Sequence, residues 1–143
     1  MRVLWLSHLV PWPATGHGSL QRSHHLLRQA ARRAEVHLIA VNNRGLMPDE
    51  RVDAARRELA AICASVAVIE RPADRSNLHR GAALLASFLR RESFDLTWLR
   101  ARRRDVLLAA RARSETFDLV YASTIGLAPH VRWFPGVPVV LGH

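Results

Sequence analysis

The chain has 143 residues, a length that fits a single domain with one core. Its hydrophobic fraction of 49% and charged fraction of 23% are those of an ordinary folded protein and exclude a disordered chain. All 21 basic residues are arginines, set against 12 acidic residues, and the net charge of +9 predicts affinity for an anionic partner: a nucleotide, a phospholipid or nucleic acid.

The start of the chain and its cysteine content bear on the compartment. The first apolar run ends at Ser7 and His8 with no small-residue cleavage site after it, so we expect no secretory signal. No stretch approaches the roughly 20 apolar residues of a membrane span. The single cysteine, Cys63, lies in an apolar helical pattern and is interpreted as a core residue. These features predict a cytoplasmic protein, free or peripheral at the inner face of the plasma membrane.

In the first half of the chain, short apolar runs alternate with segments whose apolar residues recur at helical spacing. Ser19 is a candidate N-cap for the first helix, and residues 42–45 (NNRG) are typical of a turn. The predicted elements are, in order, a strand at 3–7, a helix at about 20–33, a strand at 35–41, a helix that begins at 48–49, and a strand at 66–69.

The second half is predicted in the same way. Ser76-Asn77 can cap a third helix, whose apolar stripe is that of a helix facing a core: Leu78, Ala82, Leu85 and Leu89. The segment FDLTWL at 94–99 echoes FDLVYA at 117–122; we interpret the second as a strand and the first as an extended connector into a helix that ends at about Arg113. A helical turn at 125–130 and a strand at 137–141 follow.

This alternation predicts an α/β fold: a Rossmann-like parallel sheet of order 3-2-1-4-5 with helices on both faces. Ligands of such sheets bind beyond the carboxyl ends of the strands, at the point where the strand order reverses. That point lies between the first and fourth strands. The loop after Ser7, the segment from Ser123, and Gly142-His143 are therefore expected to meet at one crevice.

The loop before the first helix carries the most informative motif. Gly16-His17-Gly18 could let the backbone approach a phosphate at a helix N-terminus, and Arg22, one turn later, could clamp an anion; the alternative is two glycines that merely end a loop. The dinucleotide fingerprint is not present, because a third glycine is missing and the loop is too long. Asn42, not an acidic residue, ends the second strand.

Other site types find little support. The eight histidines show no metal-ligand spacing, so we expect no metal, and no nucleophile elbow or phosphate-binding P-loop occurs. Two arginine clusters are either a solvated face or a surface attracted to anionic lipid headgroups or nucleic acid. They are Arg90-Arg91 and the group Arg100, Arg102, Arg103 and Arg104.

The opening MRVLWLSHLVPWPATGHGSLQRSHHLLRQAARRAEVHLIAV, the block FDLVYAS and the ending PGVPVVLGH together resemble bacterial family 4 glycosyltransferases of the retaining GT-B type. The resemblance implies that Gly16 and Gly18 lie against the donor diphosphate and the acceptor, with Arg22 near them. It implies that His143 is the catalytic histidine near the reacting sugar and that Ser123 faces the same crevice. It also implies a nucleotide-sugar donor as substrate, with no metal or other cofactor.

The chain departs from that family at its end. The lobe that binds the nucleotide sugar in the family, with its Glu-x7-Glu type motif, has no counterpart here. We therefore expect an incomplete N-terminal, acceptor-side lobe at 1–143, a fragment or one half of a split enzyme, that is inactive alone. If the strand at 137–141 is an edge, it should favour dimers or aggregates. Some members of the family dock on membranes through a basic patch, with which the arginine clusters are compatible.

Two further classes stay open. One is a small α/β module that binds a nucleotide or nucleic acid through its arginines, although aromatic residues form only 6% of the chain and no helix-turn-helix or RNA-binding pattern occurs, which argues against nucleic acid. The other is a different enzyme on the same scaffold, such as a sugar-nucleotide epimerase.

Overall fold

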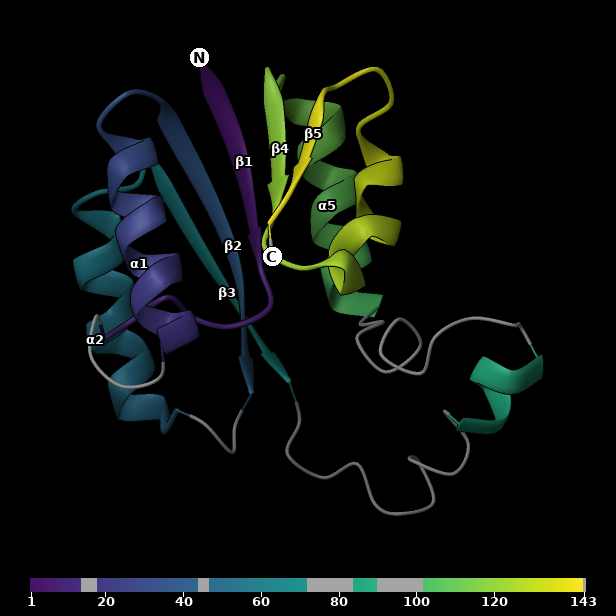
Figure 1. Ribbon diagram of the computed structural model, residues 1–143, viewed down its shortest axis with the longest axis horizontal. Coiled ribbons are helices and arrows are strands. Elements are labelled where there is room, and N and C mark those ends of the chain that lie inside the picture. The colour runs from purple at the N-terminus through teal and green to yellow at the C-terminus, as the bar shows by residue number, and fades with distance from the viewer. Residues whose placement is uncertain (14–17, 44–46, 72–83, 90–101, 143) are drawn as a thin grey trace.

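A computed structural model of the chain describes residues 1–13, 18–43, 47–71, 84–89 and 102–142. These residues contain a five-stranded parallel sheet of order β3-β2-β1-β4-β5, so the predicted Rossmann-like arrangement is confirmed (Figure 1). In chain order the strands are β1 (Arg2–Ser7), β2 (Glu35–Asn43), β3 (Ser65–Arg71), β4 (Leu119–Ala122) and β5 (Val139–Leu141).

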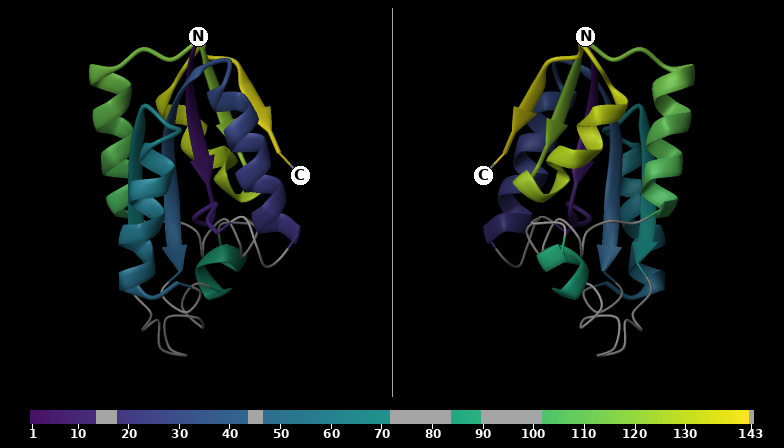
Figure 2. Two further views of the ribbon diagram at one scale, coloured as in Figure 1. Left: turned by 90° about the vertical axis from the view of Figure 1, so that its left-hand side faces the viewer. Right: turned by 90° about the vertical axis from the view of Figure 1, so that its right-hand side faces the viewer.

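Helices cover both faces of this sheet. One face is covered by α1 (Gly18–Ala31) and α2 (Asp49–Ala60), and the other by α5 (Arg102–Ser114) and the 3-10 helix η1 (Ile125–Trp133). The five strands point in the same general direction, and the N-terminus lies at their amino-end edge (Figures 1 and 2). The right-handed crossovers that parallel neighbours require account for this three-layer arrangement.

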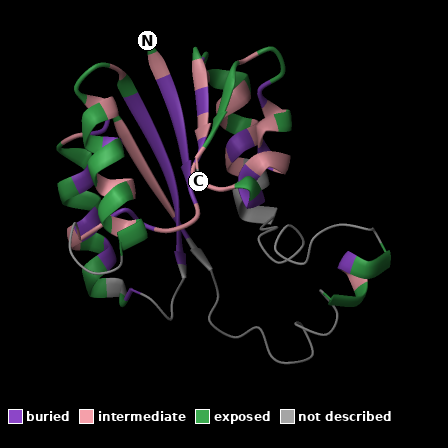
Figure 3. Ribbon diagram, in the orientation of Figure 1, coloured by how far each residue is buried: buried purple, intermediate pink, exposed green. Residues whose placement is uncertain are grey.

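The central strand β1 is buried on both faces, which explains its continuous apolar sequence. Val3 and Trp5 join the core shared with α1 and α2, whereas Leu4 and Leu6 join the core shared with α5 and η1. In Figure 3, β1 and β2 are the strands drawn most continuously as buried. Because side chains alternate along a strand, Ser7, the last residue of β1, lies on the face that α1 covers.

A polar cluster around Arg2 joins the amino ends of the strands. The Arg2 backbone N–H donates to a carboxylate oxygen of Asp118 at 2.6 Å, and its guanidinium donates to the Thr116 carbonyl at 3.1 Å. The same guanidinium pairs with Glu115 at 3.2 Å and Glu35 at 3.5 Å. These groups lie at the end of the sheet opposite the carboxyl edge, so they help to align β1, β2 and β4 without occupying the predicted crevice.

Several predicted boundaries were wrong. The first helix begins at Gly18, which puts Ser19 inside the first turn instead of at the N-cap. Asn42 is buried in β2 and does not begin a turn, because its side-chain amide donates to the Met47 carbonyl at 3.2 Å and is satisfied inside the fold. The segment after β4 is helical from Ile125, as predicted, and it is a 3-10 helix that contains Pro129, whose nitrogen has no hydrogen for an α-helical bond. The strands β4 and β5 also begin two residues later than predicted.

The interpretation of Cys63 as a core residue is confirmed. It is buried directly after α2, in the core shared with α1, and burial raises the pKa of its thiol to about 11. The prediction for the third helix is only partly confirmed. Residues 84–89 are helical, but Leu85 and Leu89 are 61% and 73% exposed, so the expectation that they face the core was wrong. The rest of that helix and the connector at 94–101 lie outside the described residues.

Candidate functional site at the carboxyl ends of β1 and β4

The site predicted from the strand order is the edge of the sheet where β1 and β4 end. Their pairing extends past β4, since the Ser123 N–H donates to the Leu6 carbonyl at 2.9 Å. The Gly142 N–H donates to the Ala122 carbonyl at 2.8 Å, which brings the end of β5 to the same edge. Ser7, Ser123 and Gly142 are therefore close together at the point of strand reversal, as the sequence predicted.

His8 and Ser123 form a hydrogen-bonded pair across this edge. The His8 backbone N–H donates to the Ser123 Oγ at 3.2 Å, and the His8 Nδ1 lies 3.0 Å from the same oxygen. These contacts fix the orientation of the imidazole and engage Nδ1. The other ring nitrogen, Nε2, makes no hydrogen bond to the described part of the chain, so it is the atom that can meet a ligand.

Burial also sets the charge of this imidazole. It lowers the pKa of His8 below the ordinary value of 6.5, because the charged form loses hydration. The ring is therefore neutral at physiological pH, with one nitrogen as donor and the other as acceptor. A neutral imidazole held in this way can hydrogen-bond a hydroxyl group or act as an acceptor for its proton.

His8 is not among the site residues predicted from the sequence, although a signal for it is present. His8 directly follows β1, and the rule that selected Ser7 as a strand-end residue selects it as well. The involvement of Ser123 with His8 carried no local signal, because 115 positions separate the two residues.

Two buried polar atoms lie on the α1-facing side of β1. The Ser7 Oγ and the Trp5 Nε1 are both buried and have no hydrogen-bond partner among the described residues. Leaving such a group unpaired costs about 1–3 kcal/mol. A ligand group that reached the Ser7 hydroxyl would offset that cost, which makes the carboxyl end of β1 a favourable place for a polar ligand.

Two aromatic rings, those of Trp5 and Tyr121, lie on the α1-facing side of the sheet near this edge. The Trp5 and Tyr121 rings stack with their centroids 3.9 Å apart and their planes at 29°. The Tyr121 ring leaves no room for a side chain at Gly142: a Cβ there would collide with the phenol oxygen and lie 2.9 Å from Cζ. Glycine at 142 is therefore required by the close approach of Tyr121.

The loop after β1 is tied to the helices. Val10 is buried in the core shared with α1 and α2. The Trp12 Nε1–H donates to Glu58 of α2 at 2.7 Å, and the His24 Nδ1 of α1 lies 2.9 Å from the Pro11 carbonyl oxygen. These contacts bring the start of α1 to the carboxyl edge of the sheet.

Some of the remaining predicted site residues are described by the structure and others are not. Gly18 is the first residue of α1, exposed and with open space around its α-carbon, and Arg22 is exposed one turn later. Gly16, His17, Arg100 and His143 lie outside the described residues. Arg102, Arg103 and Arg104 begin α5, but their side chains are not described.

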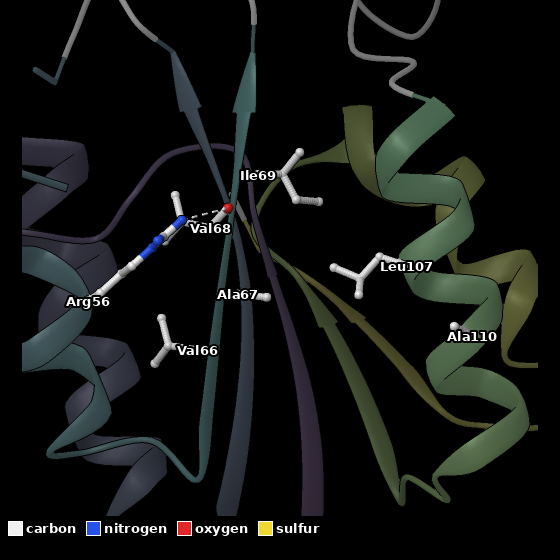
Figure 4. A pocket seen from close by; sticks show the side chains of 7 residues that line it. All are labelled: Arg56, Val66, Ala67, Val68, Ile69, Leu107 and Ala110. Atoms are coloured by element: carbon white, nitrogen blue, oxygen red, sulfur yellow. Dashed lines mark hydrogen bonds between the residues drawn. The ribbon is translucent and has the colours of Figure 1, made fainter. Parts of the chain in front are cut away.

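A second hollow lies at the other edge of the sheet, around β3 (Figure 4). It has a volume of about 510 Å³ and an apolar lining apart from Arg56: Val66, Ala67, Val68, Ile69, Leu107 and Ala110. The Arg56 guanidinium donates to the Val68 carbonyl at 3.3 Å and so covers part of the open strand edge. With one charged group and no acid, base or nucleophile in its lining, this groove is a weaker candidate for chemistry than the β1–β4 edge.

The fold and the site together define a Rossmann-like α/β domain with a pair of hydrogen-bonded polar side chains at the switch point of its sheet. The chain matches no protein-family model, no curated protein and no solved structure. Within the described ranges, no helix is long and apolar enough to cross a membrane. The same residues contain no group of three or more His, Cys, Asp or Glu that could hold a metal ion.

Proposed function

We propose that this chain is the acceptor-side lobe of a glycosyltransferase that moves a sugar from a nucleotide-sugar donor to a cell-envelope, lipid-linked or glycan acceptor. The observation that carries the proposal is the His8–Ser123 pair at the carboxyl ends of β1 and β4, the edge at which sheets of this order bind ligands. The resemblance of the opening, of FDLVYAS and of PGVPVVLGH to family 4 glycosyltransferases, in that order along the chain, also supports the proposal.

Each residue of the crevice has a role in this proposal. Ser123 positions the His8 ring, whose Nε2 hydrogen-bonds a hydroxyl group of the sugar acceptor. The N-terminus of α1 and the glycines before it receive the donor diphosphate, and Arg22 adds charge beside it. His143 would act near the reacting sugar. The nucleotide itself would bind mainly to a second lobe, so this chain alone would not transfer sugar.

The His8 ring gives a direct test. Its ¹H–¹³C signals are followed by NMR while the chain is titrated with free saccharides, with UDP and GDP, and with the corresponding nucleotide sugars. The exposed ring of His25 on α1 is the internal control. We expect saccharides and nucleotide sugars to shift the His8 signals, the free nucleotides to shift them little, and Ser123→Ala to weaken the response.

Other outcomes would contradict the proposal. A His8 response to free nucleotides alone, with none to saccharides, would favour the nucleotide-binding module considered above. No response to any of these ligands would mean that the crevice is not the substrate site. The alternative function, a module that binds a nucleotide or nucleic acid, is supported by the exposed arginines on and after α1: Arg22, Arg28, Arg32 and Arg33. Phe88 is, however, the sole aromatic among the strongly exposed apolar residues of the described chain, so a stacking surface for bases is lacking there.

A further inference from the structure

The helical turn at residues 84–89 exposes its apolar side chains and buries its polar one. Phe88 is 82% exposed, Leu89 73%, Leu85 61% and Leu84 54%. The side chain of Ser87 is buried instead, and its hydroxyl donates to the Leu84 carbonyl at 2.7 Å. In Figure 1 the turn stands apart from the sheet and its helices, and Figure 3 shows it mainly as exposed. Water favours the reverse arrangement, so the apolar side of the turn is expected to gain free energy when another apolar surface covers it.

The four apolar side chains of the turn form one continuous face. At about 100° per residue, the positions 84, 88, 85 and 89 fall within an arc of about 140°. Because the Ser87 hydroxyl is satisfied within the turn, covering this face strands no side-chain hydrogen-bonding group. A single apolar surface can therefore cover all four side chains at once.

The groove around β3 offers such a surface on the same chain. On the side of β3 that faces α5 its lining is wholly apolar: Ala67 and Ile69 from β3, and Leu107 and Ala110 from α5. Ala67 and Leu107 are only partly buried, and Ala110 is exposed. Figure 4 shows Ile69 and Leu107 pointing into the space between β3 and α5, whereas Arg56, the charged residue of the lining, lies on the side that α2 covers.

The two walls of this groove are held together beyond one of its ends. The Arg111 guanidinium of α5 donates to the Ser65 Oγ at 3.1 Å and to a carboxylate oxygen of Glu115, also at 3.1 Å. Ser65 is the first residue of β3, so this contact fixes the spacing of β3 and α5 at the amino end of the strand. At the opposite end the chain leaves β3 at Arg71, and it enters α5 at Arg102.

The chain order favours the turn itself as the occupant of the groove. The turn belongs to the connection between β3 and α5, and a right-handed crossover from β3 to β4 runs across this face of the sheet. Residues 72–83 join it to β3 and residues 90–101 join it to α5, and a connection of that length can span at most about 40 Å. Docking within one chain has an effective concentration on the order of 1 mM, which exceeds that of a second copy in a micromolar solution.

We infer that residues 84–89 are a cover that closes on the groove between β3 and α5, where the four apolar side chains of the turn pack against Ala67, Ile69 and Leu107. The structure records the open arrangement. Closing removes two apolar surfaces of the chain from water and places a second helical segment beside α5 on this face of the sheet. The inference does not depend on the proposed transferase activity.

Disulfide trapping tests the closed arrangement. The double variant Leu85→Cys/Ala110→Cys is oxidised with oxidised glutathione at micromolar concentration, and we expect an intramolecular disulfide, because closing brings the two α-carbons within the roughly 7 Å that such a bond requires. Leu85→Cys/Ala60→Cys is the matched control, since Ala60 is an exposed alanine on α2, on the opposite face of the sheet; it should cross-link at least about tenfold more slowly. Burial raises the pKa of the Cys63 thiol to about 11, so this native cysteine should not react, and both single variants check that it does not.

Thermal unfolding tests whether closing stabilises the chain. Phe88→Ser/Leu89→Ser should lower the melting temperature by about 5 °C or more, because two large apolar side chains no longer pack in the groove. Ile125→Ser is the control: it alters an apolar residue that is 75% exposed on η1 and should change the melting temperature by less than about 1 °C. Side chains that stay in water would give the same small change at both sites.

Four results would overturn the inference. If the cysteines at 85 and 110 join only between two chains, the occupant of the groove is a second copy. If they react no faster than the control pair and the serine variant melts like the parent, no closed arrangement exists. A lower melting temperature without the cross-link would mean that the apolar face packs elsewhere in the fold. A cross-link with an unchanged melting temperature would mean that the turn only passes the groove without binding there.

Discussion

Replacing Ser123 by alanine should loosen His8 at the carboxyl edge of the sheet while leaving the rest of the fold in place. The Ser123 Oγ interacts with the His8 backbone N at 3.2 Å and with Nδ1 at 3.0 Å. Each such bond contributes roughly 0.5–1.5 kcal/mol, and both residues are only partly buried, so we expect a loss of about 1–2 kcal/mol. For a chain of this length the melting temperature should fall by about 3–7 °C.

Urea unfolding followed by circular dichroism measures this loss. Ser114→Ala is the matched control, since the Ser114 Oγ donates to the Ala110 carbonyl at 3.0 Å on an exposed helix surface, and it should cost less than about 0.5 kcal/mol. The NMR signals of the His8 ring should move in Ser123→Ala and not in Ser114→Ala. Equal losses in the two variants, with unchanged His8 signals, would refute the assignment of a linked pair.

Three further predictions follow from the same edge of the sheet. Burial lowers the pKa of His8, so the unfolded chain takes up a proton at higher pH than the folded chain does. The free energy of unfolding should therefore be greatest above about pH 6.5 and decline as the pH falls from there towards the pKa of His8 in the folded chain. His8→Gln should flatten this part of the pH profile, as measured by urea unfolding. Gly142→Ala should displace Tyr121 and cost about 1–3 kcal/mol, whereas Gly18→Ala, where no atom lies within 4 Å, should not destabilise; thermal denaturation compares the two. The residues of β5 are 40–48% exposed on an edge without charged side chains, so the chain should self-associate through it, and Val140→Lys should abolish association in sizing chromatography; a parent chain that is monomeric at every concentration would count against this.

Most of the strands and helices could be predicted from the local sequence pattern. β1 and β2 are continuous apolar runs because both of their faces are buried, and the segments between the strands have helical spacing because one face of each packs on the sheet. Right-handed crossovers then favour the strand order 3-2-1-4-5, and this order determines the edge where Ser7 and Ser123 lie. The ends of elements were less predictable, as Asn42 shows, since its buried amide is satisfied by a carbonyl five residues away.

The sequence by itself therefore predicted the class of fold and the order of the strands, because these depend on periodicity and chain handedness. Only the tertiary structure decided which side chains meet at the edge where β1 and β4 end. His8 finds Ser123, and Trp5 stacks on Tyr121, across more than a hundred residues of chain. The tertiary structure also decided that the stripe of Leu85 and Leu89 faces outward, because a periodic pattern specifies that a helix has an apolar face but not what covers it.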